Sequence, residues 1–277
     1  MANSLSAACV QMTSGPDMNE NFENAASLIR DAAASGATFI ATPENTDSIR
    51  FCGKEKLSQS FYADDHPGVP YFSALAKELE VHLLIGSMAV KVSDDKIANR
   101  SFLFTPNGSV QVTYDKIHLF EVQLETGEAH READIYAQGQ NATVSSINSD
   151  FTLGLSICYD VRFAYLYRDL AKTGANILCV PAAFTVPTGQ AHWEILLRTR
   201  AIETGCYVIA PAQVGTHEGG RKTYGHSLII SPWGEVLSDA GEGVGFITAN
   251  LNVDALSKAR CAIGALNHDQ NYNIQQN

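Results

Sequence analysis

Basic residues are scarce in this sequence. Only 19 Lys and Arg stand against 30 Asp and Glu, which gives a formal net charge of −11 at pH 7. Nucleic acids and anionic membrane surfaces would repel such a chain unless a local basic patch intervened, and the sequence contains no such patch. We therefore expect neither a nucleic acid nor a membrane as a partner, and expect a small molecule as the ligand.

Long apolar runs are also missing. None approaches the roughly 18 residues that a membrane-spanning helix needs. The N-terminal segment lacks the basic region followed by an apolar region that marks a signal peptide. We expect a cytoplasmic protein. The hydrophobic fraction of 45% over 277 residues still supplies the side chains of a substantial core, so the chain is predicted to be globular.

Cysteine and histidine motifs that hold disulfides or metals are absent as well. The six cysteines include no CxxC pair, and His118, His192 and His226 show neither HxH nor HExxH spacing. We expect no disulfide framework, no metal and no cofactor. Three cysteines lie inside apolar runs, where a thiol usually behaves as a small buried hydrophobic group: Cys9, Cys179 and Cys206.

Strand and helix patterns alternate along both halves of the chain. In the first half, apolar spacing and turn residues predict helices at 22–36 and 73–81 and strands at 4–12, 38–45, 83–90 and 101–114, the last with a turn at 106–108. In the second half they predict helices at 162–174 and 191–205, strands at 151–158, 175–184 and 206–214, and a hairpin at 226–237. The polar stretch 121–143 between the halves is predicted to be irregular.

This repeated order predicts mixed sheets with helices on their outer faces. Two such halves can stack their sheets into a four-layer α-β-β-α sandwich. No linker rich in Pro, Gly or Ser separates them, so we expect one domain over residues 1–262 and a polar C-terminal tail over residues 263–277.

Cys158 differs from the other cysteines because it follows an apolar strand and precedes a segment that opens a helix. A helix N-terminus or a basic partner favours the thiolate, which makes this thiol a candidate nucleophile. A buried structural thiol at a strand end is the alternative. Asp160 and Arg162, close behind it, are expected to form an ion pair or a capping arrangement.

Two further polar residues end predicted strands. Glu44 closes the strand in TPEN, where partial burial would raise its pKa and make it a usable base, although it could instead cap a helix. Lys116 follows a strand in YDKIHLF and could be an ordinary exposed charge at a strand edge. Beside Cys158 it would favour the thiolate and stabilise an oxyanion, with the backbone N–H of Tyr159 as a second donor.

The motifs TPEN, YDKIHLF and ICYDVRF occur in the order and contexts of three catalytic motifs, so that the chain resembles the nitrilase superfamily of carbon–nitrogen hydrolases. The runs GQAHWEILLRTRAIETGCYVIAPAQ and YGHSLIISPWGEVL are similar to its Nit branch, and within that branch to the deaminated-glutathione amidases. The resemblance covers nearly the whole chain and implies the nitrilase type of α-β-β-α sandwich.

The resemblance also implies roles for individual residues. Glu44 would be the base, Lys116 the oxyanion-stabilising residue and Cys158 the nucleophile. A supporting glutamate is implied at Glu132, sixteen residues after Lys116, with Glu125 and Glu128 in the same polar stretch as alternatives. Contacts to the substrate are implied for Tyr159, Phe184 and Thr185.

The implied reaction is amide hydrolysis through a Cys158 thioester, in which ammonia leaves and water then releases the acid. A hydrolase that uses one of the eight histidines as its base is one alternative, and a binding protein that kept the fold without turnover is another. Members of the superfamily associate through the helix-rich face near the nucleophile, so a homodimer or larger homo-oligomer is expected.

For the substrate, the resemblance implies a short anionic ω-amide of a 2-oxo acid, deaminated glutathione before 2-oxoglutaramate, with N-carbamoyl amino acids as a further alternative and nitriles excluded. A chain of net charge −11 must gather local cations to hold a carboxylate, and arginine suits bidentate pairing. The candidates are Arg50, Arg162, Arg198 and Arg221.

Overall fold

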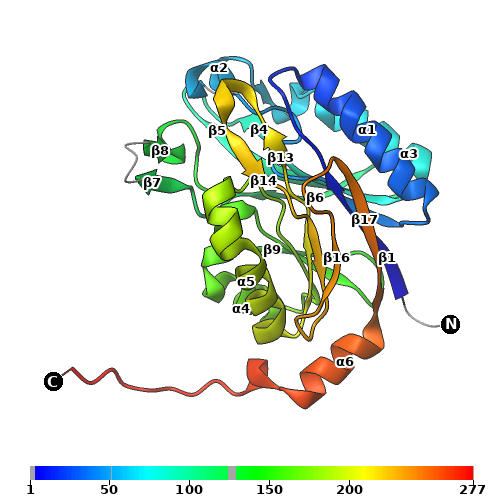
Figure 1. Cartoon of the computed structure of the whole chain (residues 1–277), viewed down its shortest axis with the longest axis vertical. Coiled ribbons are helices and arrows are strands. Elements are labelled where there is room, and N and C mark those ends of the chain that lie inside the picture. Colours follow the sequence, from blue (N-terminus) through cyan, green and yellow to red (C-terminus); the bar gives the residue numbers. More distant parts are fainter. Residues whose placement is uncertain (1–3, 51, 124–128, 277) are drawn as a thin grey trace.

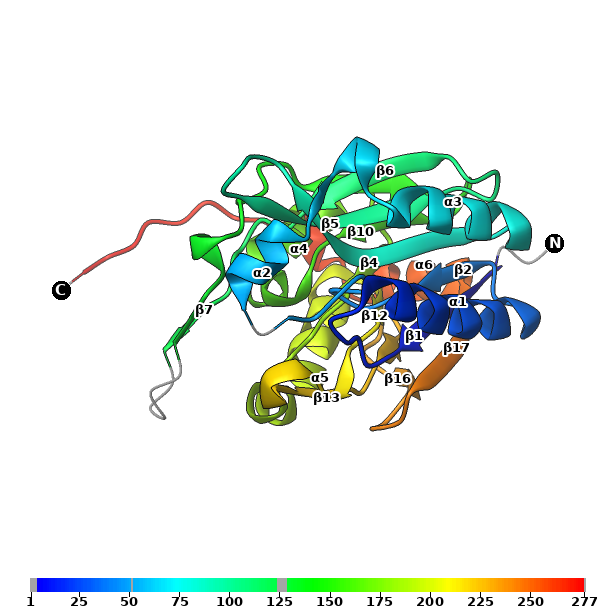
Figure 2. The same cartoon turned by 90° about the horizontal axis from the view of Figure 1, so that it is seen from above.

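The computed structural model describes residues 4–50, 52–123 and 129–276. Two β-sheets lie face to face, with α1 (Met18–Ala34) and α3 (Gly68–Leu79) on the outer face of one sheet. Helices α4 (Ala164–Lys172) and α5 (Val186–Thr204) cover the outer face of the other (Figure 1; Figure 2 shows the layers from above). The predicted four-layer α-β-β-α sandwich is confirmed.

The first sheet has the order β17-β1-β2-β4-β5-β6, with β3 paired to β4. Its parallel and antiparallel pairs make it a mixed sheet, as predicted. In chain order its strands are β1 (Ser4–Gln11), β2 (Phe39–Ala41), β3 (Phe61–Tyr62), β4 (His82–Lys91), β5 (Ile97–Phe104), β6 (Val110–Asp115) and β17 (Gly245–Asn252).

The second sheet has the order β16-β15-β12-β11-β10-β9 and is also mixed. In chain order its strands are β9 (Thr143–Ser146), β10 (Thr152–Leu155), β11 (Ile177–Cys179), β12 (Tyr207–Ala210), β15 (Leu228–Ile230) and β16 (Val236–Asp239). Two small hairpins lie outside the sheets: β7 (Glu121–Gln123) with β8 (Ala129–Arg131), and β13 (Val214–Thr216) with β14 (Lys222–Tyr224). The remaining helical pieces are α2 (Gly53–Ser58), α6 (Val253–Ala262) and the 3₁₀ turns η1 (Ala63–Asp65), η2 (Glu132–Asp134), η3 (Cys158–Arg162), η4 (Glu218–Gly220) and η5 (Ala265–Asn267).

The alternation of side chains along β1 shows how the layers are held together. Ala7 and Cys9 belong to the core between the two sheets, whereas Ala8 and Val10 belong to the core under α1 and α3. Successive side chains of a strand point to opposite faces, so a strand that is covered on both faces must be apolar throughout. The predicted burial of the Cys9, Cys179 and Cys206 thiols is confirmed, because none of the three is exposed.

A side-chain cap marks the start of α1, and prolines mark the starts of α3 and α5. The Asp17 side chain accepts the backbone N–H of Glu20 at 3.0 Å at the start of α1. Helices α3 and α5 both begin five residues before their predicted starts, each with a proline in its first turn, Pro70 and Pro187 respectively. Proline lacks only an N–H that the first turn leaves unpaired, so a helix can begin around it. Across the described residues, no helix combines the length and apolar character required to cross a bilayer.

The strand β17 was not predicted from the sequence. It pairs antiparallel with β1 along its whole length, from Ser4 opposite Asn252 to Gln11 opposite Gly245, and so joins a C-terminal segment to the first sheet. Most of its residues are partly or fully exposed, which explains why no run of apolar residues marks it. Helix α6 follows directly. Beyond η5, Asp269 pairs with Arg168 and Lys172 of α4, and the exposed chain that follows extends away from the sandwich (Figure 1).

The docking of β17 depends on Leu251, which is fully buried in the core between the sheets. We expect Leu251→Ala to lower the free energy of unfolding by about 2–5 kcal/mol, because the cavity cannot close completely between two packed sheets. Urea unfolding followed by circular dichroism measures this loss. Val244→Ala is the matched control, because Val244 is 61% exposed just before the same strand, and its effect should stay within about 0.5 kcal/mol. Equal effects of the two substitutions would contradict the role of β17 in the core.

Candidate active site

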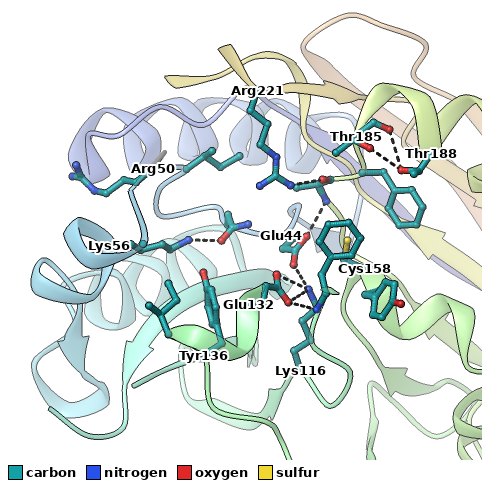
Figure 3. Close-up of a pocket in the computed structure, with 18 of the residues that line it drawn as sticks. Glu44, Arg50, Lys56, Lys116, Glu132, Tyr136, Cys158, Thr185, Thr188 and Arg221 are labelled. Carbon is teal, nitrogen blue, oxygen red and sulfur yellow. Dashed lines mark hydrogen bonds and ion pairs between the residues drawn. The ribbon is translucent and has the colours of Figure 1, made fainter. Parts of the chain in front are cut away.

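The ends of three strands place a glutamate, a lysine and a cysteine around one pocket. Glu44 lies three residues beyond the end of β2, Cys158 three residues beyond β10, and Lys116 directly after β6. All three line the same pocket, together with Glu132 from η2 (Figure 3). The pocket is therefore lined by residues that follow the ends of strands from both sheets.

Glu44 is buried, with 2% of its surface exposed, and its carboxylate is held from three directions. Its Oε1 accepts a hydrogen bond from Asn99 Nδ2 at 2.8 Å and one from Lys116 Nζ at 2.9 Å. Its Oε2 accepts the backbone N–H of Ala183 at 3.0 Å. These bonds fix the carboxylate between β5, which carries Asn99, and the segment that follows β11.

The turn that carries Glu44 packs tightly against β4 at Gly86. A Cβ atom at this position would lie 2.0 Å from the carbonyl oxygen of Thr42 and 2.5 Å from both the carbonyl oxygen of Pro43 and the Cβ of Pro181. Only glycine allows this approach. The pairing of β4 with β5 is also irregular just beyond Gly86, and such bulges occur beside active sites because they redirect a strand.

Lys116 is 1% exposed, and its ammonium lies between two carboxylates. Nζ is 2.9 Å from Glu44 Oε1 and 3.0 Å from Glu132 Oε2. Glu132 is held in turn by the backbone N–H of Phe120, which donates to its Oε2 at 2.7 Å. The structure thus brings Glu132 to the lysine, as the family resemblance implied. The two alternatives, Glu125 and Glu128, lie outside the described residues.

Cys158 adopts a left-handed backbone conformation, with a φ of +50°. A residue other than glycine rarely adopts this conformation, and such strain is concentrated at functional sites. The backbone N–H of Cys158 donates to the carbonyl of Pro181 at 2.9 Å, which holds the turn in place. The predicted helix start is corrected here, because Cys158 begins the short 3₁₀ turn η3 and α4 begins only at Ala164.

Charges and burial set the protonation of these groups. Burial raises the pKa of Glu44, but the charge and hydrogen bond of Lys116 outweigh it, and the pKa lies below its ordinary value of 4.5. Burial lowers the pKa of Lys116, but the charges of Glu132 and Glu44 outweigh it and hold that pKa well above its ordinary value. Burial and then the charge of Glu44 raise the pKa of Cys158, against the opposite effect of Lys116.

Two predictions are therefore corrected. The pKa of Glu44 was expected to rise with burial, and it falls because the neighbouring ammonium dominates. Lys116 was expected to favour the Cys158 thiolate, but burial and the charge of Glu44 outweigh the effect of Lys116 and raise the pKa of the thiol. The resting site consequently pairs a neutral thiol with an ionised carboxylate.

The three residues implied to contact the substrate all line this pocket. The Phe184 ring packs against Trp193, with the ring centroids 4.7 Å apart, so it also belongs to the core. Thr185 lies directly before α5, and its hydroxyl lies 2.9 Å from that of Thr188. Tyr159 follows Cys158 directly and packs edge-on against Phe120.

Three of the four arginines proposed to bind a carboxylate line the pocket, and the fourth does not. Arg162 lies 5.7 Å from the centroid of the Tyr159 ring and 5.6 Å from that of Phe184. Arg50 donates to the carbonyl of Pro16. Arg198 is corrected, because it lies on the outer surface, where it pairs with Glu194 at 3.1 Å.

The sequence missed two polar residues that organise the site. Lys56 is buried beside the pocket and donates to Asn45 Oδ1 and to the carbonyl of Ser48. Asn99 hydrogen-bonds to Glu44, and its carbonyl accepts the backbone N–H of Lys116 at 3.0 Å. Asparagine is uncommon in strands, and Asn99 would have been a signal if the strand had been predicted to begin at Ile97.

Asp160 joins the lysine and cysteine segments. Its two oxygens accept hydrogen bonds from the backbone N–H groups of Ile157 at 2.8 Å and His118 at 2.9 Å, and from the Tyr114 hydroxyl at 2.7 Å. A further contact of 2.7 Å links it to His118 Nδ1. Of the two predicted alternatives, the capping arrangement is the one formed, since Asp160 caps η3. In the parts of the chain that the structure describes, no group of three or more His, Cys, Asp and Glu residues could hold a metal ion.

The family model for carbon–nitrogen hydrolases matches residues 6–260. The chain belongs to the carbon–nitrogen hydrolase family. It is thus a hydrolase of the family that acts on non-peptide carbon–nitrogen bonds, as the resemblance implied. The deaminated glutathione amidase of Synechocystis sp. is 43% identical over 267 residues, which are 95% of this chain and 97% of that protein. The human deaminated glutathione amidase is 36% identical over 270 residues, 95% of this chain and 81% of that protein.

Solved structures of the family have the same fold. The C. elegans NitFhit protein superposes with a TM-score of 0.89 at 33% identity, and covers 98% of this chain. This chain spans 66% of the longer NitFhit chain. Saccharomyces cerevisiae Nit3, described as a member of branch 10 of the nitrilase superfamily, superposes with a TM-score of 0.84 at 28% identity and covers 94% of both chains.

The hydrogen bonds to Asp160 can be tested by substitution. We expect Asp160→Asn to lower the free energy of unfolding by about 2–5 kcal/mol. The amide NH₂ would replace one carboxylate oxygen of Asp160 and could not accept the hydrogen bonds that this oxygen now accepts. Thermal unfolding of the purified variant measures the loss. Asp169→Asn, at an exposed position of α4, removes the same charge and should change stability by less than about 0.5 kcal/mol. Similar melting temperatures for wild type and Asp160→Asn would refute this role.

Proposed function

We propose that the chain is an amidase that hydrolyses deaminated glutathione, with Cys158 as nucleophile, Glu44 as base and Lys116 as electrostatic stabiliser. The observation that carries the proposal is the Lys116 ammonium, buried between Glu44 and Glu132 at the pocket that contains Cys158. The names of the relatives, of which two at 43% and 36% identity cover 95% of this chain, support the choice of substrate.

The reaction begins when the Cys158 sulfur attacks the amide carbonyl and its proton passes to Glu44, which is ionised because of the lowered pKa. The carbonyl oxygen becomes an oxyanion, which Lys116 and the backbone N–H of Tyr159 stabilise. Glu44 then protonates the leaving nitrogen, the carbon–nitrogen bond breaks, and a thioester remains on Cys158.

The second half of the reaction uses the same groups. Glu44 takes a proton from water, the resulting hydroxide attacks the thioester carbonyl, and Lys116 again stabilises the oxyanion. The carbon–sulfur bond breaks, the sulfur recovers its proton from Glu44, and the carboxylic acid leaves. None of the residues that line the pocket in the described structure is a histidine, which argues against the alternative of a histidine base.

The charges of the pocket suit an anionic substrate. Five cations line it, against the two carboxylates Glu44 and Glu132, in a chain of net charge −11. Deaminated glutathione carries a carboxylate at each end of the molecule, one on the 2-oxo acid and one on the glycine. Its scissile nitrogen belongs to cysteinylglycine, so that dipeptide would leave; the ammonia expected from the sequence would leave only from a primary amide such as 2-oxoglutaramate.

We also infer a cytoplasmic location and a homo-oligomeric state. The absence of disulfides among the six cysteines suits a reducing compartment. Apolar side chains are exposed on the face formed by α4 and α5, where Tyr165 is 60% exposed and Ile195 is 68% exposed. Such a face is suited to association between copies of the chain.

The pairing of Lys116 with Glu44 predicts a pH dependence. In wild type, the rate of Cys158 alkylation by iodoacetamide should be level from neutral pH down to about 4.5, because exchange of one proton between Cys158 and Glu44 does not depend on pH. Lys116→Met removes the largest influence that lowers the pKa of Glu44, so this pKa should rise. The fall of the alkylation rate at acid pH should then begin more than about one pH unit higher, and turnover should be lost. Mass spectrometry of the alkylated protein gives the rates.

Lys258→Met, at an exposed position of α6, is the control for that experiment and should retain the wild-type profile. If the alkylation rate of Lys116→Met fell at the same acid pH as that of wild type, the ammonium would not set the protonation of Glu44.

A substrate panel tests the proposed function. Wild type should hydrolyse deaminated glutathione with a higher kcat/KM than 2-oxoglutaramate or an N-carbamoyl amino acid, and should leave nitriles intact. Cysteinylglycine and ammonia must both be measured, because the two 2-oxo acids release different amines. Cys158→Ala should retain less than about a thousandth of this activity with an unchanged circular dichroism spectrum. Comparable rates in that variant would place the nucleophile elsewhere.

A further inference from the structure

Arg221 lies directly before β14 and reaches the pocket from above Glu44 (Figure 3). The hairpin that carries it is attached to the pocket wall. Thr223 pairs with Thr185, and the backbone N–H of Tyr224 donates to the carbonyl of Phe184 at 2.9 Å. The position of the Arg221 backbone is therefore set by the same segment that lines the site.

The guanidinium of Arg221 is only partly used within the protein. Its Nη2 donates to the carbonyl of Ala183 at 3.0 Å. Its Nε is buried and has no hydrogen-bond partner among the described residues. The two carboxylates that line the pocket, Glu44 and Glu132, both pair with Lys116 instead. A buried cationic donor without a partner is costly, and its position in a ligand pocket points to an anion as the missing acceptor.

The surroundings of Arg221 place it on the side of the pocket where the leaving group must lie. Ala183 connects the two groups, since its N–H is bonded to Glu44 and its carbonyl to Arg221. The charge of Arg221 also contributes to the lowered pKa of Glu44. Glu44 is the proposed proton donor to the leaving nitrogen, so the amine must depart along this side.

We propose that Arg221 is a specificity-determining residue that binds the carboxylate of the leaving group. This inference rests on the proposed function, in which the leaving group is cysteinylglycine. A dipeptide spans roughly 7 Å when extended, so its carboxylate lies well beyond the scissile bond, within reach of an arginine on the pocket wall. The pairing of guanidinium with carboxylate would be bidentate, through Nε and one terminal nitrogen.

Arg162 differs from Arg221 in its position. It follows the nucleophile turn and lies over the rings of Tyr159 and Phe184, where it is available to the 2-oxo acid that stays on Cys158 as the acyl group. Two arginines on two sides would thus distinguish a substrate with a carboxylate at each end from a primary amide that has only one.

The test compares three substrates: deaminated glutathione, the same compound with its glycine carboxylate converted to a carboxamide, and 2-oxoglutaramate. In wild type, neutralising the glycine carboxylate should lower kcat/KM by at least about tenfold, mainly through KM. In Arg221→Met the two glutathione compounds should react within about threefold of each other. The loss on deaminated glutathione should exceed the loss on 2-oxoglutaramate by about tenfold or more. Arg221→Lys should recover part of the preference, since it restores the charge without the bidentate geometry.

Lys222→Met is the matched control, because it removes the same charge from the exposed residue next to Arg221 in the same hairpin. It should leave kcat/KM for all three substrates unchanged. An equal loss on all three substrates in Arg221→Met would overturn the inference and assign Arg221 to the support of Ala183 and Glu44. Failure of wild type on deaminated glutathione would instead overturn the proposed function, and this inference with it.

Discussion

The site depends on the burial of one cation. Lys116 is 1% exposed, and an ammonium can be removed from water at acceptable cost only if anions and hydrogen-bond acceptors surround it. Glu44 and Glu132 provide that surrounding, at 2.9 Å and 3.0 Å. The three side chains come from different parts of the chain, so their electrostatic pairing also ties together the segments after β2, after β6 and at η2. The pairing of Lys116 with Glu44 and Glu132 therefore both stabilises the pocket and makes it polar.

The same pairing decides how the proposed chemistry proceeds. Because Lys116 keeps Glu44 ionised, Glu44 can accept a proton, and because the cysteine is buried beside that carboxylate, its thiol keeps its own proton until a substrate is attacked. A resting thiol reacts less readily with other electrophiles than a resting thiolate does. The oxyanion that forms during attack then gives the ammonium a further negative partner in the low-dielectric pocket.

Supporting groups hold this arrangement from both sheets. Asn99 on β5 and the backbone of Ala183 after β11 orient the Glu44 carboxylate, and Asp160 joins the turn of Cys158 to the segment of Lys116. Gly86, in the middle of β4, permits the close packing of the turn after β2 and of Pro181, which follows β11 of the second sheet. Each of these contacts crosses between segments far apart in sequence, which is why the site exists only when the sandwich is complete.

The sequence by itself determined the layers and the order of the reactive groups. The spacing of apolar residues indicates which helices and strands are buried on one face or on both. Polar or reactive residues directly after apolar strands indicate strand ends, so Glu44, Lys116 and Cys158 could be found in the sequence. The family resemblance also implied Glu132, with Glu125 and Glu128 as alternatives. Only the tertiary structure decided the pairing of β17 with β1, the use of Asn99, the separation of Arg198 from Arg221, and the direction in which the pKa values of Glu44 and Cys158 move. These features depend on distances through space between residues far apart in the chain, and neither periodicity nor composition carries that information.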